Sequence, residues 1–220
     1  MKTVYVDFDG TIVDVMPRYH GILESYIKRE KFIEIDFNKY KSLKRKGIKD
    51  YDIVKRLCEG NEIDLEDYLK FKRLNLENFK WLKKDIIIGS PEEAYHKLQN
   101  QGYRVVLLTQ RYIEKNLHKQ VKMLNIEKCF DEIIVVKPLP NQNAKIKYLK
   151  NIINIEDIII GDSRDEMETA EKLNIAGFFV TSGLWNESFA GPIAQVFNNY
   201  NTVVDYIVGE RVVIGWSEKL

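Results

Sequence analysis

The sequence predicts an α/β protein with a doubly wound parallel sheet and a helical insertion after the first strand. Short runs dense in valine and isoleucine, bounded by polar residues or glycine, are typical of strands buried on both faces of such a sheet. These runs are Thr3–Val6, Arg104–Leu108, Glu132–Val136, Asp157–Ile160 and Gly177–Val180. Helix-like segments alternate with the runs from about residue 86 to 181, which is the pattern of a doubly wound sheet.

The helices expected between these strands have recognisable ends. Ser90 is a good N-cap, Pro91 suits the first helical position, Glu93 completes a capping pattern, and Gly102 is a preferred stop. Helical spacing also continues through three later segments, Tyr112–Leu124, Asn143–Ile152 and Asp165–Leu173. Each expected strand after the first is therefore followed or preceded by a helix that can cover the sheet.

Residues 15–85 break the alternation because they contain no comparable β-branched run. They are rich in Lys, Glu, Leu, Ile and Tyr at helical spacing, so we expect a helical insertion. The α/β core then consists of residues 1–14 and 86–220. In the tail after Thr202, VVDYIVG fits either a helix or a strand, and RVVIGW predicts a short extra strand.

The composition argues against several classes of protein. The chain has 220 residues, is 45% hydrophobic and 30% charged, and carries a formal net charge of +1, so we expect a globular protein without a nucleic-acid or membrane partner. No apolar run has the length of a membrane span or a signal peptide. Cys58 and Cys129 are far apart and form no CxxC pair. These features favour a reducing cytoplasm, and none indicates an oligomeric state.

Chemically useful side chains follow four of the expected strands. Ligands bind at the carboxyl ends of the strands in open α/β sheets, so these residues are expected to converge. The first strand is followed by Asp7 and Asp9, the second by Thr109 and Gln110, the third by Lys137, and the fourth by Asp162, Asp165 and Glu166.

Several converging carboxylates require a cation, and hard oxygen ligands suit Mg²⁺. Asp7 and Asp162 are natural direct ligands, and either Asp165 or Glu166 can complete the set. A lysine and a threonine would then hold a phosphoryl group. One aspartate of the first pair can attack phosphorus, and the other can protonate the leaving group and later deprotonate water.

The motifs DFDGT, the apolar run ending at Thr109, VVKP and IIIGDSRDE resemble, in order, the four motifs of the haloacid dehalogenase-like (HAD) hydrolase superfamily. The resemblance implies a Rossmann-like core and a Mg²⁺-dependent phosphatase. It assigns Asp7 as nucleophile and Asp9 as general acid and base, with its backbone carbonyl on magnesium. Thr109 and Lys137 would hold the phosphoryl group, with Gln110 beside Thr109, and Asp162 and Glu166 would hold the metal.

Two positions depart from the family pattern. Glu166 stands where the family usually has Asp, so Asp165 and Glu166 both remain candidates for the metal. Lys145, in the first turn of the next expected helix, competes with Lys137 for the phosphate role, and Lys137 fits the family's Lys-Pro pattern better.

The insertion resembles the α-helical cap of the phosphoglycolate phosphatase-like and beta-phosphoglucomutase-like members. The basic stretch around Lys44 and Arg45 places two candidate ligands for a second anionic group of a small phosphorylated metabolite, although a solvated charge run has the same appearance. A sugar phosphomutase is the nearest alternative to a phosphatase, and a catalytically silent binding protein on this fold is a further one.

Overall fold

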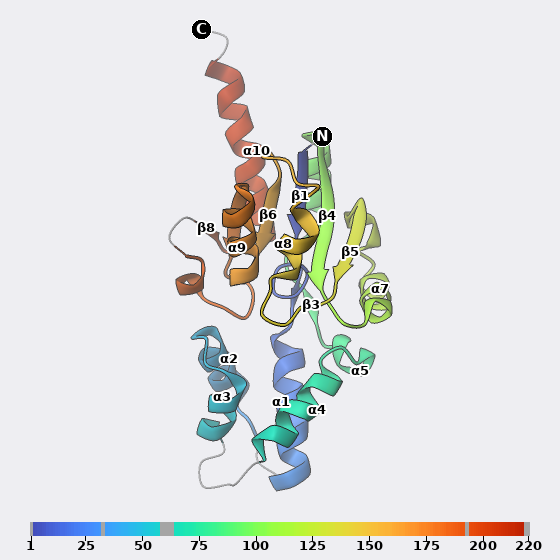
Figure 1. Cartoon of the computed structure of the whole chain (residues 1–220), viewed down its shortest axis with the longest axis vertical. Helices are drawn as coiled ribbons and strands as arrows, with labels where there is room; N and C mark the ends of the chain where they lie inside the picture. The colour runs from blue at the N-terminus through green and yellow to red at the C-terminus, as the bar shows by residue number, and fades with distance from the viewer. Residues whose placement is uncertain (1, 32–33, 58–63, 192–193, 218–220) are drawn as a thin grey trace.

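A computed structural model of the chain describes residues 2–31, 34–57, 64–191 and 194–217. Its core is a six-stranded parallel sheet in the order β5-β4-β1-β6-β7-β8, which confirms the predicted fold class (Figure 1). The strands are β1 (Lys2–Val6), β4 (Tyr103–Gln110), β5 (Glu132–Val136), β6 (Ile158–Gly161), β7 (Ala176–Val180) and β8 (Gln195–Phe197). The sequence did not predict β8.

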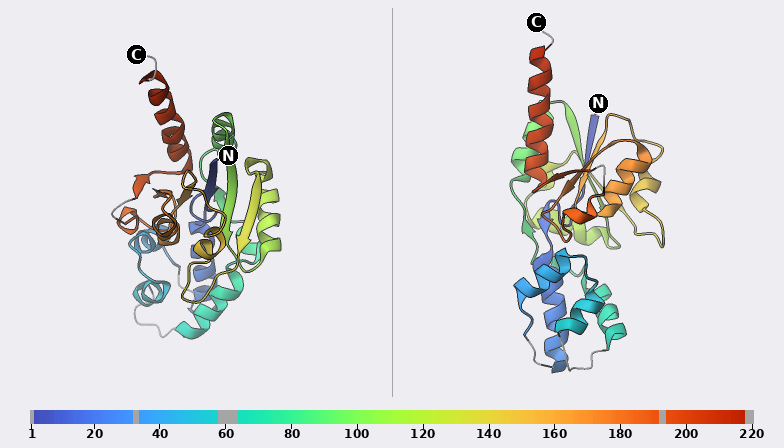
Figure 2. Two further views of the ribbon diagram at one scale, coloured as in Figure 1. Left: turned by 45° about the horizontal axis from the view of Figure 1, so that its top comes forward. Right: turned by 90° about the vertical axis from the view of Figure 1, so that its left-hand side faces the viewer.

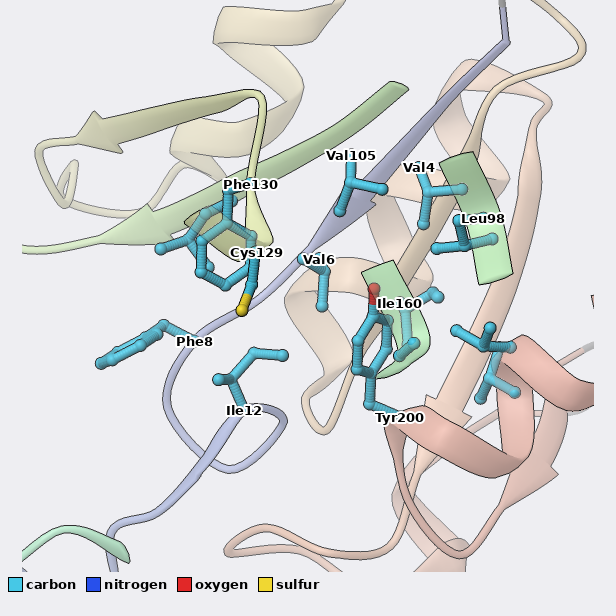
Figure 3. Close-up of a cluster of buried hydrophobic side chains, with 14 of the residues drawn as sticks. Val4, Val6, Phe8, Ile12, Leu98, Val105, Cys129, Phe130, Ile160 and Tyr200 are labelled. Carbon is cyan, nitrogen blue, oxygen red and sulfur yellow. The ribbon is translucent and has the colours of Figure 1, made fainter. Parts of the chain in front are cut away.

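Helices cover both faces of this sheet, because alternate residues of each strand point to opposite sides. Val4 and Val6 of β1 pack with α6 (Pro91–Asn100), α7 (Glu114–Met123) and α10 (Tyr200–Ser217). Figure 3 shows part of this cluster, including Leu98 and Tyr200. On the other face, Tyr5 packs with α8 (Ala144–Leu149) and α9 (Arg164–Leu173).

Among the described residues between 16 and 82, five helices form the insertion. They are α1 (Met16–Lys31), α2 (Phe37–Arg45), α3 (Asp50–Leu57), α4 (Leu65–Asn75) and α5 (Phe79–Leu82). Their buried side chains form a separate apolar cluster that includes Leu23, Tyr40, Ile53 and Tyr68. We call this helical layer the cap (Figure 2).

The cap faces the carboxyl ends of the core strands. In Figure 1 the arrowheads of β4 and β5 point toward the cap helices. The chain leaves the core through β2 (Val13–Asp14) and returns through β3 (Ile86–Ile87), and these two short strands pair in antiparallel fashion. Asp14 accepts a hydrogen bond from the amide of Met16 at 2.8 Å, which helps to start α1.

The expected strand at residues 211–216 is wrong, because these residues lie in α10. Asn199 and Thr202 exchange side-chain hydrogen bonds with each other's backbone at the start of this helix. Val203 and Val204 are then fully buried against the sheet. Tertiary packing of the first turns thus overrides the strand preference of Val203 and Val204.

None of the helices in the described part of the chain has the length and apolar character of a bilayer span. Cys129 is a buried free thiol. Cys58 lies outside the described residues.

Candidate active site

Asp7 follows β1 directly and remains in register with the sheet, since its amide donates to the carbonyl of Ile160 at 2.9 Å. The chain then turns sharply, and the amides of Ile12 and Val13 return to the carbonyl of Phe8. Gly10 has φ +81°, and a Cβ there would lie 2.2 Å from Asp162 Oδ2. The DFDGT stretch therefore needs its glycine both for the turn and for close contact with Asp162.

Asp7, Asp162 and Glu166 form a buried group at the carboxyl edge of β1 and β6, which we call the acid cluster. The Lys145 ammonium lies 2.5 Å from Asp7 Oδ1 and 2.5 Å from Glu166 Oε1. The lysine side chain is almost completely buried. Burial alone would lower the pKa of Lys145, but Asp7 and Glu166 raise it, so the lysine is charged.

The structure corrects the predicted position of the lysine, because Lys145 and not Lys137 reaches the acid cluster. Lys137 follows β5, which is an edge strand separated from β1 by β4, and its side chain is exposed. Asn143 caps α8 by accepting from the amide of Lys145, and it donates to the carbonyl of Asp165 at 2.7 Å. This bridge holds the first turn of α8 against α9 and directs Lys145 inward.

The three acids of the IIIGDSRDE motif have different hydrogen-bond partners. Asp162 Oδ2 accepts from the amide of Leu184 at 2.9 Å, and a Cβ at Gly183 would lie only 1.8 Å from that oxygen. Glu166 Oε2 accepts from the amide and hydroxyl of Ser163, which completes a capping box at the start of α9. Asp165 points elsewhere and accepts from Gln110 at 2.8 Å.

The acid cluster carries more negative charge than its single lysine balances. Burial raises the pKa of Asp7 to about 7, and Glu166 adds to the shift while Lys145 opposes it. Burial, followed by repulsion from Asp7 and Glu166, raises the pKa of Asp162 well above its usual value. In the described part of the chain, no set of three or more acids, histidines or cysteines is arranged as a ready metal site.

Asp9 has a different environment from Asp7, although only one residue separates them. Arg111 donates to Asp9 Oδ1 at 2.5 Å, and Arg18 lies 2.9 Å from Oδ2. Burial opposes the change, but Arg111 and Arg18 lower the pKa of Asp9. Arg18 also pairs with Asp85 at 3.2 Å. Asp9 is therefore held as a carboxylate by one arginine from the core and one from the cap.

From the sequence, Arg111 is a candidate to contact either the substrate or a neighbouring acid, and it contacts Asp9, whereas Arg18 was not predicted. Arg111 carries a usable signal, because it follows Thr109 and Gln110 at a strand end. Arg18 carries none, because it is one of many charged residues in the insertion and reaches the site only through the position of α1. Thr109 itself is buried at the carboxyl end of β4, beside β1, as the sequence predicts.

The two predicted cap ligands face different ways. Arg45 donates to the carbonyl of Thr181 in the core, and its own carbonyl accepts from Asn186 at 3.2 Å. Arg45 therefore docks the cap on the core. Lys44 is buried inside the cap and lies 2.5 Å from Asp50 Oδ1.

The sequence model of the haloacid dehalogenase-like hydrolase family matches residues 4–180. The chain belongs to this family. The match covers β1, the cap and the core strands as far as β7, so it includes every predicted site residue. No curated protein matches the sequence.

Solved structures show the same fold over nearly the whole chain. A putative phosphatase from Clostridium difficile aligns with TM-score 0.72 and 18% identity, covering 94% of this chain and 98% of that one. A predicted phosphoglycolate phosphatase from Haemophilus somnus aligns with TM-score 0.67 and 19% identity at the same coverages. A putative beta-phosphoglucomutase from Thermotoga maritima gives TM-score 0.62, 18% identity and again the same coverages. These similarities show that the fold is shared over nearly the whole chain.

Proposed function

We propose that this protein is a Mg²⁺-dependent phosphatase that hydrolyses a small phosphorylated metabolite through an aspartyl-phosphate on Asp7. The observation that carries the proposal is the buried contact of Asp7 with Lys145, beside Asp162 and Glu166, at the carboxyl edge of the sheet. Membership in the haloacid dehalogenase-like hydrolases supports it, because the same motifs carry this chemistry in the family.

The residues present suit a magnesium ion. Asp7 and Asp162 offer hard carboxylate oxygens, and the backbone carbonyl of Asp9 is the third ligand that the family pattern implies. The raised pKa values of Asp7 and Asp162 indicate that a further positive charge would stabilise both carboxylates. Bound magnesium would neutralise the oxygens of the phosphoryl group. Glu166 remains a candidate ligand, while its oxygens contact Lys145 and Ser163.

Different residues of the protein carry out the parts of the two chemical steps. A carboxylate oxygen of Asp7 attacks phosphorus, and the bond from phosphorus to the leaving oxygen breaks. Lys145 and Thr109 hold the phosphoryl oxygens. Asp9 must first take up a proton, against the effect of Arg18 and Arg111, before it can give that proton to the leaving oxygen. In the second step Asp9 takes a proton from water, which attacks the aspartyl-phosphate and regenerates Asp7. Arg18 and Arg111 favour the ionised form of Asp9, which is the form that this second step requires.

The cap supports a small-molecule substrate. Arg45 ties the cap to the carbonyl of Thr181, and Arg18 ties it to Asp9, so the cap covers the carboxyl edge of the sheet. Such a cover excludes water and large partners from the reacting groups. The near-neutral net charge favours neither nucleic acid nor membranes as a partner, and we propose a cytoplasmic location on the same grounds as in the sequence analysis.

The direct test is release of phosphate from p-nitrophenyl phosphate, with magnesium and with excess chelator. We expect release that depends on magnesium. No hydrolysis across a broad panel of phosphate esters would contradict the proposal. A panel of sugar phosphates, scored for free phosphate and for isomerised product, separates a phosphatase from a phosphomutase.

A further inference from the structure

A buried carboxylate outside the acid cluster takes no part in the two chemical steps described above. Asp85 lies between α5 and β3, where the chain returns from the cap to the core, and it is 4% exposed. Its Oδ1 lies 3.2 Å from Arg18 Nε of α1, and its Oδ2 accepts from Gln120 Nε2 of α7 at 2.7 Å. Asp85 therefore contacts one helix of the cap and one helix of the core.

Arg18 has a separate partner for each nitrogen of its guanidinium group. Nε faces Asp85, Nη1 donates to the carbonyl of Leu76 at 2.9 Å, and Nη2 lies 2.9 Å from Asp9 Oδ2. The arginine side chain is 1% exposed. Because a guanidinium group is planar and rigid, fixing two of its nitrogens also fixes the third. Asp85 and Leu76 thus set the contact that Arg18 makes with Asp9.

The charges around Asp9 balance only when Asp85 is included. Asp9 pairs with Arg18 and Arg111, and both arginine side chains are almost completely buried. One carboxylate between two guanidinium groups would leave a buried positive charge without a partner, which is costly. Asp85 supplies the second carboxylate, so these four side chains together are neutral.

Asp85 is itself costly to bury. Burial raises its pKa to about 7, while Arg18 opposes this rise and Asp9 adds to it. The two carboxylates therefore interact across the guanidinium group that they share. Stability alone does not explain a carboxylate at this position, since apolar residues often replace buried ion pairs without loss of stability.

Gln120 holds Asp85 from the core side. Its side-chain amide donates to Asp85 Oδ2 and also to the carbonyl of Leu82, at 3.2 Å, and the residue is fully buried. The Asp85 carboxylate is thus fixed on one oxygen by the core and faces Arg18 with the other. Such an arrangement limits the movement of Arg18 relative to Asp9.

We propose that Asp85 is a positioning residue for Asp9. Asp85 orients Arg18, and Arg18 holds the Asp9 carboxylate where it can serve the leaving oxygen. The inference rests on the proposed phosphatase function and deepens it, because it adds a residue that acts on Asp9 without touching the substrate. Asp85→Asn keeps the shape of the side chain but removes its charge, so Arg18 and Asp9 lose their fixed positions.

The test uses two substrates that differ in their need for an acid. The leaving group of p-nitrophenyl phosphate departs readily without a proton, whereas that of phenyl phosphate depends strongly on proton donation. The readout is the ratio of kcat/KM for p-nitrophenyl phosphate to kcat/KM for phenyl phosphate. Both values come from the same preparation, so a loss of folded enzyme cancels.

In Asp85→Asn this ratio should rise by about tenfold, a part of the usual contribution of a general acid. Asp157→Asn is the matched control, because Asp157 is an equally buried aspartate that accepts from the amides of Thr3 and Asn154 at the amino ends of β1 and β6. That variant can lose stability, but its ratio should equal that of the wild type. An unchanged ratio in Asp85→Asn overturns the proposal.

Arg18→Met decides whether Asp85 acts through Arg18. This variant should raise the ratio as well, and adding Asp85→Asn to it should cause no further rise. A further rise of the same size would show that Asp85 acts by another route, and the proposal would be wrong. If Asp85→Asn does not fold, Gln120→Met replaces it, because it removes the amide that holds Asp85. An unchanged ratio in Gln120→Met then overturns the proposal equally.

The two proposals fail in different ways. If the wild type hydrolyses neither phenyl ester with magnesium, the phosphatase function is contradicted, and the positioning role is tested by denaturant unfolding instead. The wild type, Asp9→Asn, Asp85→Asn and the double variant form a cycle of unfolding free energies. Non-additive losses that become additive in the Arg18→Met background support the link between the two aspartates. Additive losses in the presence of Arg18 overturn it.

Discussion

The acid cluster of the core has an excess of buried negative charge, whereas the cap cluster, formed by Lys44, Asp50 and Lys72, has an excess of buried positive charge. In the core, Lys145 pairs with Asp7 and Glu166, and Asp162 lies beside these two carboxylates. In the cap, Lys44 and Lys72 surround Asp50. Burying an unpaired charge costs several kcal/mol, so a ligand of the opposite sign would stabilise each group. The comparison indicates that the strand ends of the core, and not the cap helices, are prepared for a cation, with Asp9 and its arginines between them.

The largest effect is expected from Asp7→Asn. An amide cannot attack phosphorus as a carboxylate does, so turnover should fall by about four orders of magnitude or more, while the fold is retained. Steady-state hydrolysis of p-nitrophenyl phosphate measures this loss. Asp165→Asn is the matched control, because Asp165 contacts Gln110 outside the acid cluster, and its activity should change far less. Comparable losses of activity in both variants would contradict the assignment of Asp7, and not Asp165, to the reacting group.

Replacing Lys145, the buried lysine of the acid cluster, should be the next most damaging change. Lys145→Met leaves Asp7 and Glu166 without their partner, and kcat should fall by about 10²- to 10³-fold. The unfolding free energy should also decrease, by about 3–5 kcal/mol, as when one partner of a buried ion pair is removed. Lys137→Met, at an exposed side chain, should change stability by less than about 0.5 kcal/mol. Activity assays and denaturant unfolding of both variants test which lysine serves the active site. If Lys137→Met lost more activity than Lys145→Met, the assignment would pass to Lys137.

A smaller effect is expected from displacing Asp162 without changing it. In Gly183→Ala the new methyl group would lie 1.8 Å from Asp162 Oδ2, so the loop or the carboxylate must move. We expect the magnesium concentration for half-maximal activity to rise by about tenfold. Gly209→Ala, where a Cβ meets no atom within 4 Å, should leave that concentration unchanged. An unchanged value in Gly183→Ala would show that the position of Asp162 does not matter.

The smallest effect concerns the helix that carries Glu166. Ser163→Ala removes the hydroxyl that caps α9 and that donates to Glu166 at 2.7 Å. The free energy of unfolding should fall by about 1 kcal/mol, the usual cost of a lost N-cap, with a modest loss of activity. Urea unfolding followed by circular dichroism measures it. A loss of activity as large as that of Asp7→Asn would mean that the hydroxyl has a direct part in the chemistry.

The sequence predicted the core well because its signals are local. β-Branched runs between helical segments identify the parallel sheet, and the residues after each run identify its reactive edge. Lys137 was favoured over Lys145 because it directly follows a strand, and only packing of α8 against α9 brings Lys145 inward. Arg18 and its partner Asp85 were not predicted, because helical spacing cannot show which face of a cap helix meets the core.

Calorimetric titration with Mg²⁺ shows whether the core edge, and not the cap, binds the cation. We expect wild-type protein to bind magnesium and Asp162→Asn to weaken the binding by about tenfold or more. Lys72→Met should bind as the wild type does, because its charge lies in the cap. Absent binding, or binding that Lys72→Met changes and Asp162→Asn does not, would contradict the account.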